Sequence, residues 1–152
     1  MKKLLVATAV LFFSSIGFCQ TCEQRESKLL EAVGSFSAGM LYNTYGTIGS
    51  IVDGYAHDAY QAETVNSLLD AQKKLMDNLV KVLEDLKEGG FLTAKDDINY
   101  ASTAITILKG LKLQAQYMLD YVKNNTQKNQ DAYDAQRTKN WKDISKLMGL
   151  EG

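Results

Sequence analysis

Apolar residues three or four positions apart recur along this chain, and no proline interrupts them. Because proline breaks helix interiors, its absence from 152 residues permits long helices. The clearest run covers residues 63–88, where Lys87-Glu88-Gly89-Gly90 ends it with a base and two glycines suited to a helix C-terminus. Such a stripe is typical of a helix packed against other helices. Its main apolar members are Val65, Leu69, Met76, Leu79, Leu83 and Leu86.

A second run predicts a helix from Thr93 to about Asn124. The Thr93 hydroxyl can cap free backbone N–H groups, and acidic residues follow in the first turn, where the helix dipole favours them. Leu108 of this helix and Leu79 of the preceding one lie in the middle of their stripes, so we expect both in the core. The stripe consists of Ile98, Ala101, Ile105, Leu108, Leu111, Ala115, Leu119 and Val122.

Two flanking helices complete the pattern. Thr21-Cys-Glu-Gln24 matches a capping box and predicts the start of the first helix, while the last covers residues 129–148. Four such segments with short links predict an all-α fold, an up-and-down antiparallel four-helix bundle. The first stripe is Leu29, Val33, Phe36, Met40, Thr44, Ile48, Val52 and Tyr55. The last face holds Tyr133, Trp141, Ile144 and Met148.

The end of the first helix is less sharply marked, because Gly46, Gly49 and Gly54 all punctuate the region. We place the turn at residues 55–62, which gives two arms of similar length, and a turn at residues 42–49 is the competing hypothesis. Small residues also crowd positions 34–39. They favour close approach of a neighbouring helix, and a kink or a ligand crevice is the alternative.

The N-terminus predicts export. Lys2 and Lys3 precede an uncharged apolar run at residues 4–13, and small residues follow, which is the pattern of a secretory signal. We expect cleavage after Cys19, so that residues 1–19 are a signal peptide and residues 20–152 form a single helical-bundle domain. The expected location is therefore periplasmic or secreted. The apolar run is also too short to span a bilayer.

The two cysteines flank this exit. A lipidated cysteine needs a small residue just before it, but Phe18 precedes Cys19 and Thr21 precedes Cys22, so lipoprotein anchoring is disfavoured. An alternative exit after Gly17 would keep Cys19 in the mature chain. If the signal peptide is cleaved after Cys19, Cys22 either pairs with another chain or remains a free thiol. A homo-oligomer is therefore one of the open alternatives.

Charge argues against nucleic acid and anionic lipid as partners. The whole chain has 17 basic and 18 acidic residues, a net charge of −1. Loss of Lys2 and Lys3 with the signal makes the mature chain more acidic. No basic field remains to attract phosphates, so we expect no nucleic acid partner. We also expect no membrane span, because no later segment is apolar enough to form one.

Catalytic and metal chemistry finds little support in the residue pattern. His57 is the only histidine, and Asp53 lies four residues earlier on the same helical face, where the pair could bind a metal or form a helix-end contact. A di-iron bundle needs two Glu-x-x-His motifs, and c-type haem needs Cys-x-x-Cys-His, and neither occurs. We therefore expect no catalytic residues, no cofactor and no enzyme activity, and a metalloprotein centred on His57 is the weaker alternative.

Tyrosines mark the candidate binding surface. Four of the eight in the chain lie around the first turn, together with the three glycines and the only histidine. Tyrosine combines an apolar ring with a polar tip and is favoured at interfaces, although it also covers core edges. The expected function is an exported, non-catalytic interaction protein whose partner is a cell-envelope protein. A bundle that binds a small ligand in a pocket near residues 42–60 is the alternative. The candidate residues are Tyr42, Tyr45, Asp53, Tyr55, His57 and Tyr60.

Overall fold

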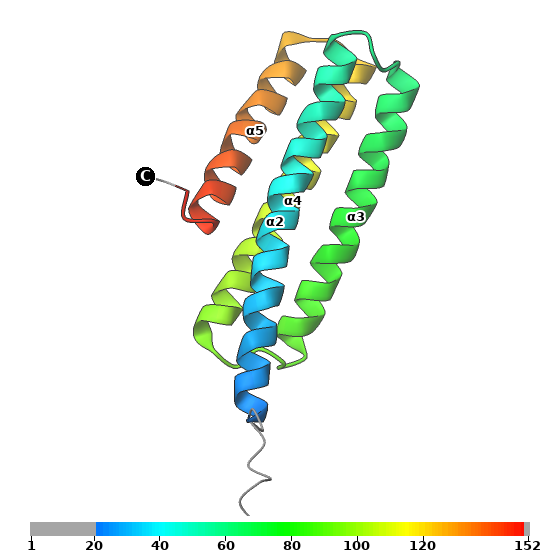
Figure 1. Ribbon diagram of the computed structural model, residues 1–152. Coiled ribbons are helices and arrows are strands. Elements are labelled where there is room, and N and C mark those ends of the chain that lie inside the picture. The colour runs from blue at the N-terminus through cyan, green and yellow to red at the C-terminus, as the bar shows by residue number, and fades with distance from the viewer. Residues whose placement is uncertain (1–20, 151–152) are drawn as a thin grey trace, which may run out of the picture. The chain divides into compact units, whose positions relative to one another are not determined.

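The computed structural model describes residues 21–150, so the predicted signal peptide lies outside the described part of the chain. Within this range the chain is all-helical, with four helices and no strand, an arrangement compatible with a helical bundle (Figure 1). The helices are α2 (Cys22–Ala56), α3 (Ala62–Glu88), α4 (Lys95–Lys123) and α5 (Gln127–Leu147). One compact unit reaches to Val33 and a second begins at Gly34. The all-α prediction is confirmed.

Polar contacts show that α3 and α4 run antiparallel. Lys109 Nζ lies 2.8 Å from Glu84 Oε1, and Lys112 Nζ lies 2.6 Å from Asp77 Oδ1. Residue numbers therefore rise along α4 as they fall along α3. On its other side α4 packs against α5, where Asn140 Nδ2 donates to Gln114 Oε1 at 2.8 Å.

The core is centred on α4, which has more buried side chains than the other described helices. Leu108 is buried as predicted, whereas Leu79 is half-buried and packs against the edge of the core. Burial of apolar area at these positions supplies most of the stabilisation. The other helices contribute Leu41, Ile48 and Ile51 from α2, Val65, Leu69 and Met76 from α3, and Tyr133 and Ile144 from α5.

The predicted stripe of α2 is wrong in its first half. Leu29, Val33, Phe36 and Met40 are 67%, 51%, 80% and 42% exposed. The buried residues are Leu41, Thr44, Ile48 and Ile51, which also follow a spacing of three and four. Two adjacent faces of α2 carry apolar residues, so the spacing alone does not select the one that packs.

The helix ends agree with most of the predicted signals. Thr21 and Gln24 form the predicted capping box, since each backbone N–H donates to the other side chain at 3.2 Å. The α2–α3 turn lies where expected, and α2 continues unbroken through Gly46 and Gly49, which excludes the competing turn. Thr93 is not a cap. The N-cap of α4 is Ala94, without a side-chain bond, and the helix begins one residue later.

Gly34 and Gly39 are not needed for close helix approach, because a Cβ on either glycine would meet open space. Helix α4 reaches this segment through the Tyr100 hydroxyl, which donates to the Gly34 carbonyl at 2.7 Å. The close approach occurs instead at Gly110 of α4. A Cβ there would collide with the carboxamide oxygen of Asn140 on α5. Gly110 therefore lets the two helices approach, which offsets its low helix propensity.

Candidate functional site

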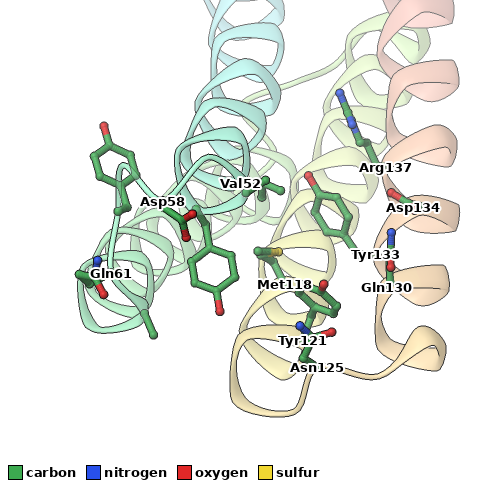
Figure 2. Close-up of a pocket in the computed structure, with 14 residues that line it drawn as sticks. Val52, Asp58, Gln61, Met118, Tyr121, Asn125, Gln130, Tyr133, Asp134 and Arg137 are labelled. Carbon is green, nitrogen blue, oxygen red and sulfur yellow. The ribbon is translucent and has the colours of Figure 1, made fainter.

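A cavity of about 540 Å³ opens between two turns of the unit that begins at Gly34. The C-terminal end of α2 and the α2–α3 turn form one wall (Figure 2). The C-terminal end of α4 and the N-terminal half of α5 form the other. This volume lies within the range of about 300–1,000 Å³ for small-molecule sites. The first wall includes Val52, Tyr55, Asp58, Tyr60 and Gln61, and the second includes Met118, Tyr121, Gln130, Tyr133, Asp134 and Arg137.

The first wall is shaped by an unusual helix stop. Asp58 has φ 59°, a left-handed conformation that glycine usually supplies at this position. The backbone N–H of Asp58 donates to the Tyr55 carbonyl at 3.1 Å, and that of Ala59 donates to the Gly54 carbonyl at 2.8 Å. These two bonds are those of a Schellman motif. The left-handed residue that ends α2 is therefore an aspartate, and this aspartate also lines the cavity.

Gly54 explains how the turn folds back onto α2. A Cβ at Gly54 would collide with the ring of Tyr60, and the Gly54 carbonyl accepts from the Tyr60 N–H at 3.0 Å. The missing side chain lets the Tyr60 ring close over the helix end. A glycine that a sequence pattern treats as a helix defect is therefore what allows this wall to form.

The second wall rests on a buried hydrogen-bond chain. Gln136 Nε2 donates to Asn140 Oδ1 at 2.8 Å, and Asn140 Nδ2 donates to Gln114 Oε1 at 2.8 Å. Gln114 Nε2 in turn donates to the Tyr133 hydroxyl at 3.4 Å. The direction of these hydrogen bonds makes the Tyr133 oxygen an acceptor, so its own O–H remains a donor.

Two groups of this wall have shifted ionisation. Burial raises the pKa of the Tyr133 hydroxyl above its ordinary value, and the hydrogen bond from Gln114 opposes that shift. The pKa of the Arg137 guanidinium is also raised, chiefly by its hydrogen bond with the Tyr45 side chain. The wall therefore presents a neutral phenol and a fixed positive charge at neutral pH.

The structure separates the four predicted tyrosines into two groups. Tyr55 and Tyr60 line the cavity. Tyr42 and Tyr45 instead contact Trp141 of α5, with ring centroids 6.1 and 5.5 Å apart. Trp141, which the sequence placed on a separate helix, thus belongs to the same aromatic surface as two of the predicted tyrosines.

Asp53 and His57 lie outside the cavity lining. His57 is exposed just after α2 ends, and its Nδ1 lies 2.8 Å from the backbone carbonyl oxygen of Asp53 rather than from the carboxylate. No group of three or more His, Cys, Asp or Glu residues that could hold a metal is found among residues 21–150. The predicted Asp53–His57 proximity is real, but the imidazole contacts backbone.

The entire second wall was missed by sequence reasoning. Tyr121, Gln130 and Asp134 lie on or beside polar faces of α4 and α5, which look like ordinary solvated surface. One signal was available: the helical phase places Gln130, Tyr133, Asp134 and Arg137 on one face of α5. Only the tertiary packing brings that face opposite the α2–α3 turn.

No family model matches this chain, and no curated protein or solved structure matches it either. Across residues 21–150, none of the helices combines the length and the apolar character that crossing a membrane requires. Cys22, the cysteine within that range, is exposed and free.

Proposed function

We propose that this protein is an exported, non-catalytic up-and-down four-helix bundle that binds a ligand in the cavity between its two turns. The observation that carries the proposal is Asp58, held in a left-handed conformation while its side chain lines the cavity. Strained backbone that glycine would relieve is concentrated at functional sites. The signal pattern of residues 1–19 supports export.

The nature of the lining supports binding rather than catalysis. The cavity presents phenols, carboxamides, two carboxylates and one guanidinium, and these groups suit recognition by hydrogen bonds. The only imidazole of the chain is engaged with a backbone carbonyl elsewhere. A nucleophile paired with a base, the usual signature of covalent catalysis, is not among the lining residues.

Native mass spectrometry of protein purified gently from its own cell envelope tests this proposal. We expect the mass of residues 20–152 plus a bound molecule, and a smaller bound fraction in Gln130→Ala. Gln127→Ala is the matched control, since Gln127 is an exposed glutamine of α5 outside the cavity lining. A mass that retains residues 1–13, or a bound fraction that Gln130→Ala leaves unchanged, would contradict the proposal.

A protein partner at the aromatic surface is a second candidate. Tyr42 is 49% and Trp141 is 41% exposed although their rings lie close together. Exposed tyrosine and tryptophan side chains are typical anchors of protein interfaces. Under this hypothesis, Trp141→Ser abolishes association with a cell-envelope protein in size-exclusion chromatography while circular dichroism stays unchanged. Association that persists in Trp141→Ser would exclude this surface.

A further inference from the structure

We propose that the cavity binds a neutral saccharide of one or two rings. This inference rests on the proposed function, since it names the ligand class of the same cavity. Three properties of the lining lead to it: the balance of charge, the mixture of donors and acceptors, and the aromatic rings.

The charge balance disfavours a strongly charged ligand. The lining carries one guanidinium, that of Arg137, against the carboxylates of Asp58 and Asp134, and no lysine. A phosphate or polycarboxylate would meet two like charges and one opposite charge. A quaternary ammonium would meet two opposite charges and one like charge, the guanidinium, which stays charged beside Tyr45. A charged ligand of either sign would therefore meet at least one like charge, and like charges in a site discriminate against a ligand, so an uncharged one fits best.

The polar groups require a ligand that both donates and accepts hydrogen bonds. Gln61, Asn125 and Gln130 each offer a carboxamide with donor and acceptor atoms, and Asp58 and Asp134 offer acceptors. A hydroxyl group donates one bond and accepts others, so several hydroxyls on one ring can satisfy this mixture. A purely apolar ligand would leave these groups desolvated and unpaired, at a cost for each one.

The Tyr133 hydroxyl adds a preset donor. It is part of a residue that is only 4% exposed, and its oxygen accepts from Gln114, which is itself held by Asn140. Because Gln114 donates to the Tyr133 oxygen, we assign the remaining Tyr133 hydrogen to a ligand oxygen. A saccharide hydroxyl or ring oxygen is an acceptor of the right kind.

Aromatic rings complete the match. Tyr55 of α2, Tyr121 of α4 and Tyr133 of α5 line the cavity, together with the apolar side chains of Met118 and Val52. Figure 2 labels Tyr121, Tyr133, Met118 and Val52. Ring carbons can pack against the C–H face of a pyranose while the phenol oxygens bond its hydroxyls, because tyrosine is apolar in its body and polar at its tip.

Isothermal titration calorimetry of the exported protein tests the ligand class. The neutral probes are glucose, galactose, N-acetylglucosamine, cellobiose, lactose and chitobiose, and the charged probes are choline chloride and inorganic phosphate. We expect saturable binding of at least one neutral probe and none of either charged probe.

Variants then locate the binding site. Gln130→Ala removes one neutral hydrogen-bonding group and should weaken saccharide binding up to about tenfold. Asp134→Ala removes a charged acceptor and should weaken it by about 10- to 100-fold. Gln127→Ala and Asp131→Ala are the matched controls, since these exposed residues of α5 bond to each other at 2.9 Å and lie outside the lining. Both controls should bind like the parent.

Three outcomes overturn the inference. Binding of choline or phosphate that Gln130→Ala weakens would mean that the cavity is a binding site for another class, and the proposed function would stand. Saccharide binding that both cavity variants leave unchanged would place the sugar elsewhere on the molecule. No binding of any neutral probe would reject the ligand class, while the native mass measurement would decide the proposed function separately.

Discussion

Helices α2 and α3 follow the same apolar spacing but use it differently. In α3 the central positions Val65, Leu69 and Met76 are fully buried, and the helix is followed by Gly90, whose φ of 73° costs glycine little. In α2 the predicted stripe is largely exposed up to Met40, and the helix is followed by Asp58 in the same left-handed region. Helix α3 is therefore stabilised by its buried stripe and by a glycine after its C-terminus. Helix α2 is less stable at its C-terminus, where a left-handed aspartate borders the cavity.

The largest expected effect is at the centre of the α3 stripe. Leu69 is 0% exposed, so Leu69→Ala should leave a cavity and lower the free energy of unfolding by about 2–5 kcal/mol. Chemical denaturation followed by circular dichroism measures the change. A loss below about 1 kcal/mol would mean that the α3 stripe is no better covered than that of α2, and the comparison would fail.

The sequence predicts the helices well because their signals are local. The Thr21–Gln24 capping box and the α3 stripe involve residues within one or a few turns of each other, so nearby spacing is sufficient evidence. The rotation of α2 could not be predicted in this way. Met40 and Leu41 are neighbours and both apolar, and only the surrounding helices decide which of them is buried.

The candidate site was half predictable. Tyr55 and Tyr60 are close in sequence to the turn that forms the first wall, so aromatic clustering identified them. Asn140 was missed because polar residues are normally exposed, yet it is 1% exposed and satisfied by Gln114 and Gln136. Its burial depends on partners in two helices, which a pattern along one helix does not reveal.

The second prediction tests the stop of α3. Gly90→Asp copies the residue found at the equivalent position of α2, and a Cβ at Gly90 would meet open space. Only backbone strain should therefore appear, with a loss of about 1–2 kcal/mol in the free energy of unfolding. Gly149→Asp makes the same exchange at another left-handed glycine, beyond α5, and so serves as a control for the cost of the exchange itself. An unchanged stability in Gly90→Asp would show that Asp58 is not strained either.

The third prediction reverses the exchange in α2. Asp58→Gly should relieve the left-handed strain and raise the free energy of unfolding by about 0.5–1 kcal/mol, less than the full strain because glycine also gives the unfolded chain more freedom. Thermal and chemical unfolding both measure this gain. The same variant should bind the cavity ligand more weakly, since a lining carboxylate is lost. A variant that is less stable than the parent would remove the argument that α2 sacrifices stability for function.

The smallest effect is expected where the α2 prediction failed. Phe36 belongs to the predicted stripe but is 80% exposed, so Phe36→Ser should change the free energy of unfolding by no more than about 0.5 kcal/mol. Ile48 belongs to the same predicted stripe and is fully buried, which makes Ile48→Val the internal reference, with an expected loss of about 0.5–1.5 kcal/mol. Denaturation at two protein concentrations makes the test sharper. A loss above about 1 kcal/mol in Phe36→Ser, together with parent stability that rises with concentration, would show that a second copy of the chain covers this face in solution, because association stabilises the folded state by mass action. The contrast between α2 and α3 would then belong to the single chain and disappear in the assembly.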